Sequence, residues 1–396
     1  MIIPERPALE RRVLDLIAAP PGSRAGAARI AVVPGGCGTG RTSLLLRLRD
    51  LVGRNAAQYI DVERVATTPE RFLKAVCESS PFPMQSALAG SGDERSPRDA
   101  FAAALRFLSE ARGSTGDPVM FLLDEFLELR TFESFPGLRS VLRDFLAALQ
   151  ASPNRFVLTT RYTVRAHRLL RDAPSRFEVV AVAPLSPAEV RATLPPMERR
   201  RTEEEEDHTR DELARLVQAL ADGRPAYARL IAETAVAMAP RGGADPVGAL
   251  SALLAPGGQL TTLLRFCYEL RLHRARGYGA LKAILEVLAA EEPLTLTEIA
   301  LRLRRTPGST KDYLSWLEDV DLIDARQKRY RVADPLMRVW IRLHCRAVPP
   351  AEEEVAHEVH TYVLGRLPDV SAAPLALTAA VPGGGTERDW GIIEID

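Results

Sequence analysis

The octet Gly35-Gly-Cys-Gly-Thr-Gly-Arg-Thr42 carries the most specific chemistry in the chain. It matches the phosphate-binding pattern Gly-x-x-x-x-Gly-Lys-[Ser/Thr] at Gly35, Gly40 and Thr42, whereas Arg41 stands where the pattern has lysine. Glycines let successive backbone N–H groups turn inward on phosphate oxygens, and the Thr42 hydroxyl would hold Mg²⁺. Arg41 keeps the positive charge, but its head group is larger and planar and has a different reach. The octet therefore predicts a phosphate-binding loop with an atypical cation.

The residues on both sides of the octet favour this prediction. Ala28–Val33 is a short apolar run, as expected of a buried parallel strand, and Ser43–Val52 has leucines at helical spacing. A strand, a glycine loop and a helix in this order are the context that the motif requires. The alternative is an ordinary glycine-rich turn that binds nothing.

Two carboxylates, Asp124 and Glu125, follow the apolar run Val119–Leu123. This is the Walker B arrangement, in which Asp124 would bind Mg²⁺ and Glu125 would orient an attacking water. The dipeptide by itself could be an ordinary strand end. Its position about 80 residues after a phosphate-binding loop favours the catalytic interpretation.

The next apolar strand candidate, Phe156–Thr159, runs into Thr160 and Arg161. In a parallel sheet its carboxyl end would lie beside the phosphate-binding loop. Arginine forms bidentate bonds to phosphate oxygens, so Arg161 is a candidate sensor of the γ-phosphate. The alternative is a polar strand terminus.

The octet, the two carboxylates and Arg161 can act together only if the fold brings the ends of their strands together. The sequence pattern of the N-terminal half predicts such a fold. Strand candidates alternate with helical segments; the strands are Gln58–Val62, Val119–Leu123, Phe156–Thr159 and Glu178–Val182, and the helices include Arg98–Glu110 and Leu138–Leu149. This alternation predicts an α/β fold with a parallel five-stranded sheet flanked by helices, with ligands at the carboxyl ends of the strands. A capped helix start follows the last strand, with Ser186 as N-cap, Pro187 first and Glu189 third.

Composition limits the class of protein. The 396 residues are 46% apolar and 26% charged with zero net charge, which indicates a soluble protein without a global attraction to nucleic acid or membrane. No apolar stretch reaches spanning length, and the N-terminus does not resemble a signal peptide. Only four of the 52 basic residues are lysine, so a chain-wide arginine bias offers a simple origin for Arg41.

Cysteine usage indicates a reducing compartment. Cys37, Cys77, Cys267 and Cys345 lie far apart without Cys-x-x-Cys spacing, which argues against a zinc site and against a disulfide framework. We therefore expect a cytoplasmic protein. Cys37 lies inside the octet, where a small loop residue is a simpler interpretation than redox control.

The C-terminal half is mostly helical in its patterns. We divide the chain into a nucleotide-binding domain (1–193), a charged linker (194–210), a helical lid (211–275), a winged-helix domain (276–346) and a tail that is expected to be poorly ordered in part (347–396). Within the lid, Pro240–Pro256 is expected to link helices, and Gly223-Arg-Pro225 separates Asp211–Ala221 from Ala226–Met238. Ser79–Gly92 is expected to be a surface loop, and Asp389–Asp396 a strand.

The winged helix is predicted from three helices and a basic hairpin. The helices are Tyr278–Ala290, Leu296–Arg305 with Thr297 as N-cap, and Thr310–Val320 after a tight turn at Thr306–Ser309; the strands are Leu322–Asp324 and Tyr330–Val332. Six basic residues could contact DNA phosphates, namely Arg302, Arg304, Arg305, Arg326, Lys328 and Arg329. The third helix carries Asp312, Glu318 and Asp319, which suit a major groove poorly. The alternative is a module that packs within the chain or on a protein partner.

The order of these motifs resembles the STAND class of signalling ATPases within the AAA+ superfamily, and especially its archaeal-type and bacterial members. The resemblance covers roughly residues 4–345 and uses the phosphate-binding loop, the Asp-Glu and Thr-Thr-Arg strands, the Pro-Leu-Ser helix start and Gly-x-Pro. Arg6–Glu10 resembles a stretch that precedes the loop in that family, and Asp334–Trp340 matches a common continuation of its winged helix.

The resemblance implies a P-loop NTPase that binds ATP or ADP with Mg²⁺. It implies that Thr42 and Asp124 hold the metal, that Glu125 activates water and Arg161 acts as sensor, and that Pro225 packs near the adenine. It also implies nucleotide contacts from Gly35, Gly36, Cys37, Gly38, Thr39, Gly40, Arg41, Thr42 and Ser43. Because Arg41 replaces the lysine that serves hydrolysis in the family, we expect binding with slow or conditional turnover.

Three functions are open at this point. The first is a nucleotide-dependent molecular switch that acts on a protein partner or by self-association. The second is a DNA-binding AAA+ ATPase or regulator that contacts DNA through its winged helix. The third is a scaffold whose nucleotide site is vestigial.

Overall fold

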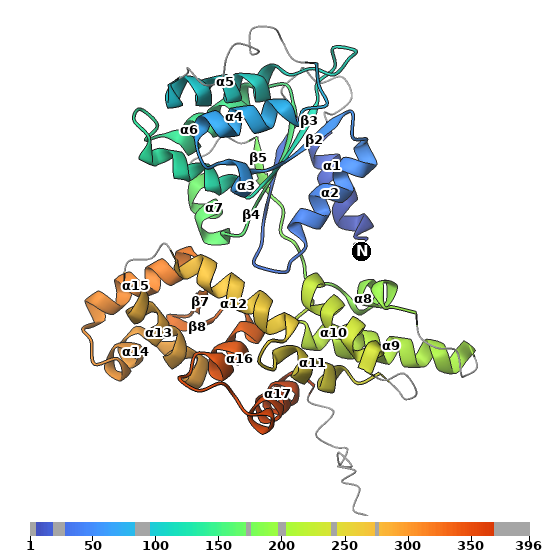
Figure 1. Cartoon of the computed structure of the whole chain (residues 1–396), viewed down its shortest axis with the longest axis vertical. Helices are drawn as coiled ribbons and strands as arrows, with labels where there is room; N and C mark the ends of the chain where they lie inside the picture. The colour runs from blue at the N-terminus through green and yellow to red at the C-terminus, as the bar shows by residue number, and fades with distance from the viewer. Residues whose placement is uncertain are drawn as a thin grey trace, which may run out of the picture.

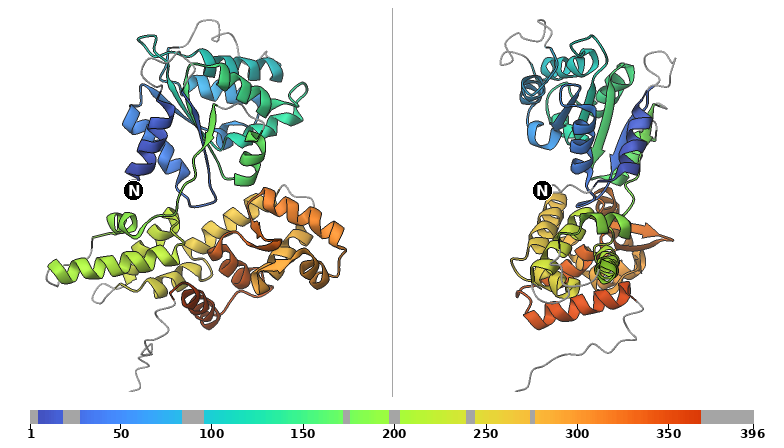
Figure 2. Two further views of the ribbon diagram at one scale, coloured as in Figure 1. Left: turned by 180° about the vertical axis from the view of Figure 1, so that it is seen from behind. Right: turned by 90° about the vertical axis from the view of Figure 1, so that its right-hand side faces the viewer.

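The structure is a computed structural model that describes residues 5–18, 28–83, 96–171, 176–196, 203–238, 244–273 and 277–367. Figure 1 shows two lobes, an α/β lobe formed by the N-terminal half and a helical lobe formed by the C-terminal half. The phosphate loop, residues 35–42, leaves the α/β lobe between β1 and α2 and reaches the helical lobe, as Figure 1 and Figure 2 both show. The candidate site therefore lies where the lobes meet.

A parallel five-stranded sheet forms the centre of the α/β lobe, and it confirms the predicted fold class. Its order is β2-β3-β4-β1-β5, with the strands at Ala57–Asp61, Met120–Asp124, Arg155–Thr160, Ile30–Pro34 and Phe177–Val179. β5 is shorter than predicted, because only residues 177–179 lie opposite β1. The carboxyl ends of β1, β3 and β4 are neighbours, so the segments that follow them lie along one edge of the sheet.

Helices cover both faces of this sheet, and successive residues of β1 face opposite sides. Ala31 and Val33 pack with the buried residues of α1 (Pro7–Ile17) and α2 (Arg41–Val52), whereas Ile30 and Val32 belong to the core of the other face. The remaining helices of this lobe are α3 (Val62–Val65), α4 (Pro69–Glu78), α5 (Pro97–Glu110), the 3-10 helix η3 (Phe126–Ser134), α6 (Val141–Ala151) and α7 (Thr163–Leu170).

The helical lobe combines ten helices of the described ranges with a small antiparallel sheet of order β6-β8-β7. The helices are α8 (Pro187–Thr193), α9 (Glu203–Leu220), α10 (Pro225–Met238), α11 (Pro246–Leu254), α12 (Gln259–Leu272), α13 (Tyr278–Glu291), α14 (Leu296–Arg302), α15 (Pro307–Asp319), α16 (Pro335–His344) and α17 (Glu352–Arg366). The strands are β6 (Leu294–Thr295), β7 (Ile323–Arg326) and β8 (Arg329–Val332). Within the described ranges no single helix is long and apolar enough to cross a bilayer, although α11 and α12 pass that criterion as a pair bent by 52°.

Two helix starts in this lobe differ from the prediction. Thr295, not Thr297, caps α14, because the Glu298 backbone N–H donates to its hydroxyl and the Glu298 carboxylate accepts from the Thr295 N–H. This reciprocal pair is a capping box. The predicted turn after α14 is the start of α15, since Thr306 caps that helix and Pro307 occupies its first position.

Three segments predicted as linkers or tail contain helices. α11 begins inside the predicted connection 240–256, where Asp245 accepts two backbone N–H groups and Pro246 takes the first helical position. Residues 203–210 of the charged linker belong to α9, and residues 352–366 of the tail form α17. Proline breaks a helix only in its interior and favours a helix start in the first turn, which explains the error at α11.

Several predictions fall on residues outside the described ranges. Most of the loop predicted at Ser79–Gly92, residues 197–202 of the linker, and the strand predicted at Asp389–Asp396 belong to this group.

The helical lobe docks on the α/β lobe through the end of α15. The Asp321 carboxylate accepts the backbone N–H of Thr163 and, at 3.3 Å, that of Val164, which are the first residues of α7. Arg168 on the same helix pairs with Asp319 at 2.7 Å. The buried side chains of the two lobes also form one continuous cluster.

Candidate functional site

The phosphate loop joins the end of β1 to the start of α2, as the motif predicts. Gly38 and Gly40 have left-handed backbones with φ of 75° and 86°, which residues with a Cβ rarely adopt. A Cβ on Gly38 would also lie 3.1 Å from the ring of Tyr227. The loop therefore requires glycine at Gly38 both for its turn and for close packing against the helical lobe.

Arg41 holds two groups at once. Its Nη1 donates to the Gly36 carbonyl oxygen at 3.1 Å, and its Nη2 pairs with Glu125 Oε1 at 2.5 Å. The Arg41 side chain is 10% exposed, so this ion pair is largely shielded from water. A planar guanidinium can donate in two fixed directions, whereas a lysine ammonium acts as a point charge. Arg41 thus connects the phosphate loop directly to the carboxylate predicted to activate water.

Glu125 is engaged through both carboxylate oxygens. Oε1 accepts from Arg41, while Oε2 accepts the Arg161 backbone N–H at 2.9 Å and lies 3.2 Å from Arg161 Nε. The Glu125 backbone is left-handed with φ of 56°. Such conformations are uncommon for residues with a side chain and cluster at functional sites. In this arrangement two arginines neutralise the Glu125 carboxylate.

Asp124 is the last residue of β3, and its carboxylate accepts hydrogen bonds from three hydroxyl groups. Its Oδ2 accepts from Thr42 Oγ1 at 2.6 Å and from the Tyr59 hydroxyl at 3.0 Å, and the Thr159 hydroxyl donates to Oδ1. Burial and the Asp124 charge raise the pKa of Tyr59, which keeps this hydroxyl a donor. The fold thus brings together Thr42 and Asp124, whose oxygens are the hard ligands that Mg²⁺ prefers.

Arg161 follows β4 and is buried between two carboxylates. It pairs with Glu125 and with Glu63, the second of these at the start of α3. Burial lowers the pKa of Arg161, but the charges of Glu125 and Glu63 outweigh burial and raise it. The predicted sensor therefore belongs to the same ionic cluster as Arg41 and Glu125.

The helical lobe supplies Arg224 and Tyr227, which the sequence analysis did not single out. Arg224 Nη1 donates to the Cys37 carbonyl oxygen at 2.9 Å and lies 3.1 Å from Asp334 Oδ2. The Tyr227 hydroxyl donates to Asp334 at 2.7 Å, and burial together with the Asp334 charge raises the pKa of Tyr227. The only local signal was the position of Arg224 inside Gly-x-Pro, which by itself indicates a turn.

The residues after Arg224 pack directly on the glycines of the phosphate loop. The Ala226 backbone N–H donates to the Gly38 carbonyl oxygen at 3.1 Å. Pro225 Cγ lies 3.4 Å from the position that a Cβ on Gly40 would occupy. Pro225, predicted to pack near the adenine, therefore lies against the loop itself.

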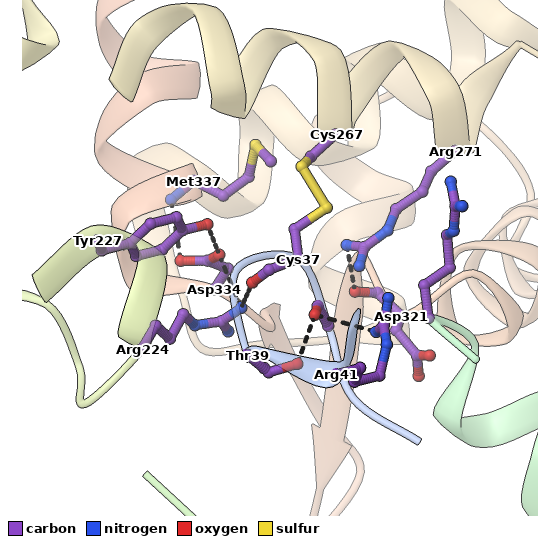
Figure 3. The surroundings of a disulfide bond; sticks show 12 residues. Cys37, Thr39, Arg41, Arg224, Tyr227, Cys267, Arg271, Asp321, Asp334 and Met337 are labelled. Carbon is purple, nitrogen blue, oxygen red and sulfur yellow. Dashed lines mark hydrogen bonds and ion pairs between the residues drawn. A yellow bond between two sulfur atoms is a disulfide. The ribbon is translucent and has the colours of Figure 1, made fainter. Parts of the chain in front are cut away.

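Arg271 on α12 is a buried cation with unused donors. It is 5% exposed, and its Nη1 donates to the Asp321 carbonyl oxygen at 3.1 Å, whereas Nε and Nη2 have no hydrogen-bond partner among the described residues. Nη2 lies 3.6 Å from the position of a Cβ on Gly36, so the guanidinium faces the phosphate loop, as Figure 3 shows. Burial lowers the pKa of Arg271. Unpaired buried donors are unfavourable, and an anion on the loop would satisfy them.

Cys37 and Cys267 form a disulfide bond, which contradicts the prediction against disulfides. The bond joins the phosphate loop to α12, with the Cα atoms 6.4 Å apart and 230 residues between the cysteines in sequence (Figure 3). Local cysteine spacing carries no information about a contact of this kind, which arises only when the lobes dock. Cys77 and Cys345 take part in no disulfide in the described part of the chain.

A small cavity of about 20 Å³ lies beside the phosphate loop, where α1 approaches Pro225. Its lining includes Arg6, Thr39, Gly40 and Ser43. Pockets that hold drug-sized ligands have volumes of roughly 300–1,000 Å³. A nucleotide would therefore fit in this cavity only if the elements that line it moved apart.

The basic residues considered for DNA contact lie on the surface of the C-terminal module. Three of them have carboxylate partners: Arg302 pairs with Glu291, Arg326 with Asp324 and Arg329 with Glu298. The other three, Arg304, Arg305 and Lys328, are exposed. The end of α15, which corresponds to the third helix of the predicted winged helix, contacts α7 through the pair of Asp319 with Arg168.

No family model matches the sequence, and no curated protein matches it. Among solved structures, the Walker-type ATPase PABY2304 of Pyrococcus abyssi superposes with a TM-score of 0.58 at 19% identity, covering 86% of this chain and 96% of that one. A point mutant of RuvB from Thermotoga maritima superposes with a TM-score of 0.40 at 14% identity, covering 82% of this chain and 89% of that one. The strand order and the first similarity define this chain as a protein with the P-loop NTPase fold.

Proposed function

We propose that this protein is an ATP- or ADP-binding regulatory NTPase of the STAND/AAA+ type that acts as a nucleotide-dependent switch. The observation that carries the proposal is the position of the phosphate loop between the lobes. The helical lobe approaches three successive residues of this loop. Arg271 lies near Gly36, Arg224 donates to the Cys37 carbonyl oxygen, and the Ala226 N–H donates to the Gly38 carbonyl oxygen. A ligand on this loop cannot bind without changing those contacts, and differential contacts are what a switch needs.

The residues present fit a nucleotide with Mg²⁺. Thr42 and Asp124 offer adjacent oxygens for the metal, which would supply positive charge on the phosphate oxygens when bound. Arg41, Arg224 and Arg271 surround the loop with cationic donors, and guanidinium groups bind phosphate oxygens well. The open donors of Arg271 are the strongest indication of an anion, because no described residue satisfies them.

In this proposal Arg41 exchanges partners when nucleotide binds. Its guanidinium moves from Glu125 and the Gly36 carbonyl to the phosphates, and Glu125 is released to orient a water. Turnover is expected to be slow, because the ion pair between Arg41 and Glu125 competes with both roles. The lid and the C-terminal module then change position or partner according to the nucleotide.

The test is nucleotide binding by calorimetry with MgATP and MgADP on wild-type protein and on Arg41→Lys. Arg54→Lys serves as a matched control, because Arg54 is an exposed arginine that follows the same helix. We expect binding by all three proteins and an altered rate of hydrogen exchange in α12 when nucleotide is bound. Absence of binding in both the wild type and Arg41→Lys would reject the proposal.

The DNA-binding alternative receives less support. Half of the basic residues in the predicted patch are neutralised by carboxylates, and α15 uses its end for docking. Affinity for duplex DNA that falls steeply with salt, and falls again when Arg304, Arg305 and Lys328 are neutralised, would favour this alternative.

A further inference from the structure

We propose that Cys37 and Cys267 form a reversible redox modification site that controls access of nucleotide to the phosphate loop. This inference rests on the proposed nucleotide binding by that loop. In the oxidised form the helical lobe is fastened to the loop, and in the reduced form the two can separate. Nucleotide binding by the loop would thus depend on the oxidation state of the two cysteines.

The placement of the two cysteines carries the proposal. Cys37 lies within the phosphate loop, and Cys267 lies on the face of α12 that also presents Arg271 one turn later (Figure 3). Cys267 is 1% exposed, whereas Cys37 is partly exposed. Apart from the backbone, this disulfide is the only covalent connection between the lobes in the described part of the chain.

The disulfide limits how far the loop can move from α12. A disulfide requires Cα atoms within about 7 Å of each other, and here they are 6.4 Å apart. The cavity beside the loop is about 20 Å³ and is lined by Pro225 of the helical lobe, so a nucleotide there requires that the helical lobe, to which α12 also belongs, moves away from the loop. The non-covalent contacts of Arg224 and Ala226 with the loop can break and re-form, but the disulfide cannot lengthen. Nucleotide exchange is therefore hindered while the bond is intact.

A dithiol reductant can reverse the bond in two exchange steps. One thiolate of the reductant attacks the Cys37 sulfur, the protein S–S bond breaks, and Cys267 leaves as a thiolate that takes up a proton. The second thiolate of the reductant then attacks the reductant sulfur of the mixed disulfide and releases Cys37, which also takes up a proton. The protein gains two electrons and two protons, and the reductant becomes a cyclic disulfide. The partly exposed Cys37 is the accessible point of attack.

The test compares MgATP and MgADP binding to the oxidised and the dithiothreitol-reduced full chain. We expect reduction to tighten binding or speed exchange by at least about tenfold, because it raises the fraction of protein that can open. Cys267→Ser should behave like the reduced protein in both conditions. Cys345→Ser, which removes a thiol outside the disulfide, should respond to reduction like the wild type.

Each result decides the proposal. Equal binding and exchange in both redox states would overturn it while leaving the proposed nucleotide binding intact. If neither form binds nucleotide, the proposed function fails, and hydrogen exchange of residues 35–42 then decides the redox site: faster exchange after reduction supports it, and equal exchange overturns it. Alkylation of all four cysteines in protein treated with a disulfide oxidant would also overturn it.

Discussion

The replacement of lysine by arginine at position 41 has a specific consequence at the scale of single residues. Arg41 spans the distance from the Gly36 carbonyl oxygen to Glu125 and so holds the phosphate loop and the Walker B carboxylate together. Arg161 occupies the other oxygen of Glu125. The site therefore has an internal ionic cluster, and under the proposed function a phosphate would have to displace this cluster before Glu125 could act on water.

Exchange of this arginine for lysine should raise turnover. In Arg41→Lys a single ammonium cannot bridge both partners as the guanidinium does, so Glu125 is released more easily. We expect the rate of ATP hydrolysis to increase by about tenfold, equivalent to roughly 1.4 kcal/mol of barrier. Phosphate release under saturating MgATP measures this, with Arg54→Lys as control. Unchanged or lower turnover would show that the ion pair does not limit catalysis.

Replacement of Arg271 by methionine is expected to affect protein stability and nucleotide binding in opposite directions. Arg271→Met removes a buried charge with unsatisfied donors, so protein without nucleotide should be as stable as the wild type or more stable. The same change should weaken nucleotide binding by about tenfold or more, since hydrogen bonds to charged groups contribute roughly 1.5–3 kcal/mol. Calorimetry and thermal melts report the two quantities.

The control for this experiment is Arg265→Met, because Arg265 lies on the exposed side of the same helix. It should change neither quantity. A loss of stability in Arg271→Met without a loss of affinity would instead assign Arg271 a purely structural role.

At the scale of elements, α7 depends on the other lobe for its N-terminal cap. Its own N-cap residue, Tyr162, makes no side-chain capping bond, and the carboxylate of Asp321, two residues after the end of α15, accepts the first N–H groups instead. A helix start has N–H groups without intrahelical partners, so this contact serves both helix stability and docking.

Removal of this cap should loosen the docking of the lobes. We expect Asp321→Ala to lower the free energy of unfolding by about 0.5–2 kcal/mol, the usual range for an N-cap. Asp319→Ala is the matched control, since it breaks only the more exposed pair with Arg168, worth about 0–1 kcal/mol. Denaturant unfolding and hydrogen exchange of residues 163–170 measure both effects. A smaller effect for Asp321→Ala than for Asp319→Ala would contradict the capping role.

At the scale of the whole molecule, the disulfide closes a loop across most of the chain. Because the cysteines are 230 residues apart, the bond greatly lowers the conformational entropy of the unfolded chain. By loop entropy alone this stabilises the folded protein by on the order of 5 kcal/mol. Reduction should therefore lower the melting temperature of the oxidised protein by about 5 °C or more. Differential scanning calorimetry with and without dithiothreitol measures the shift, and Cys267→Ser should show none. An equal melting temperature in both redox states would mean that the bond adds nothing to stability.

Local patterns were enough to predict the scaffold of the site. The glycine spacing, the apolar runs and the carboxylate pair depend on neighbours within a few residues, and periodicity reports such neighbours well. The strand-loop-helix unit around residues 35–42, the parallel sheet and the grouping of Thr42 with Asp124 follow from these patterns. Helix starts at prolines were the main local error, because proline in a first turn and proline as a breaker look alike in sequence.

What the sequence by itself determined is therefore the P-loop scaffold and the residue types along one edge of its sheet. Only the tertiary structure decided what occupies that edge. Arg224 meets Cys37 across 187 residues, Arg41 meets Glu125 across 84, and Cys37 meets Cys267 across 230. The physical reason is that the first and third contacts form only when the two lobes dock and the second only when the sheet has assembled, and no local periodicity encodes the distance between residues so far apart in the chain.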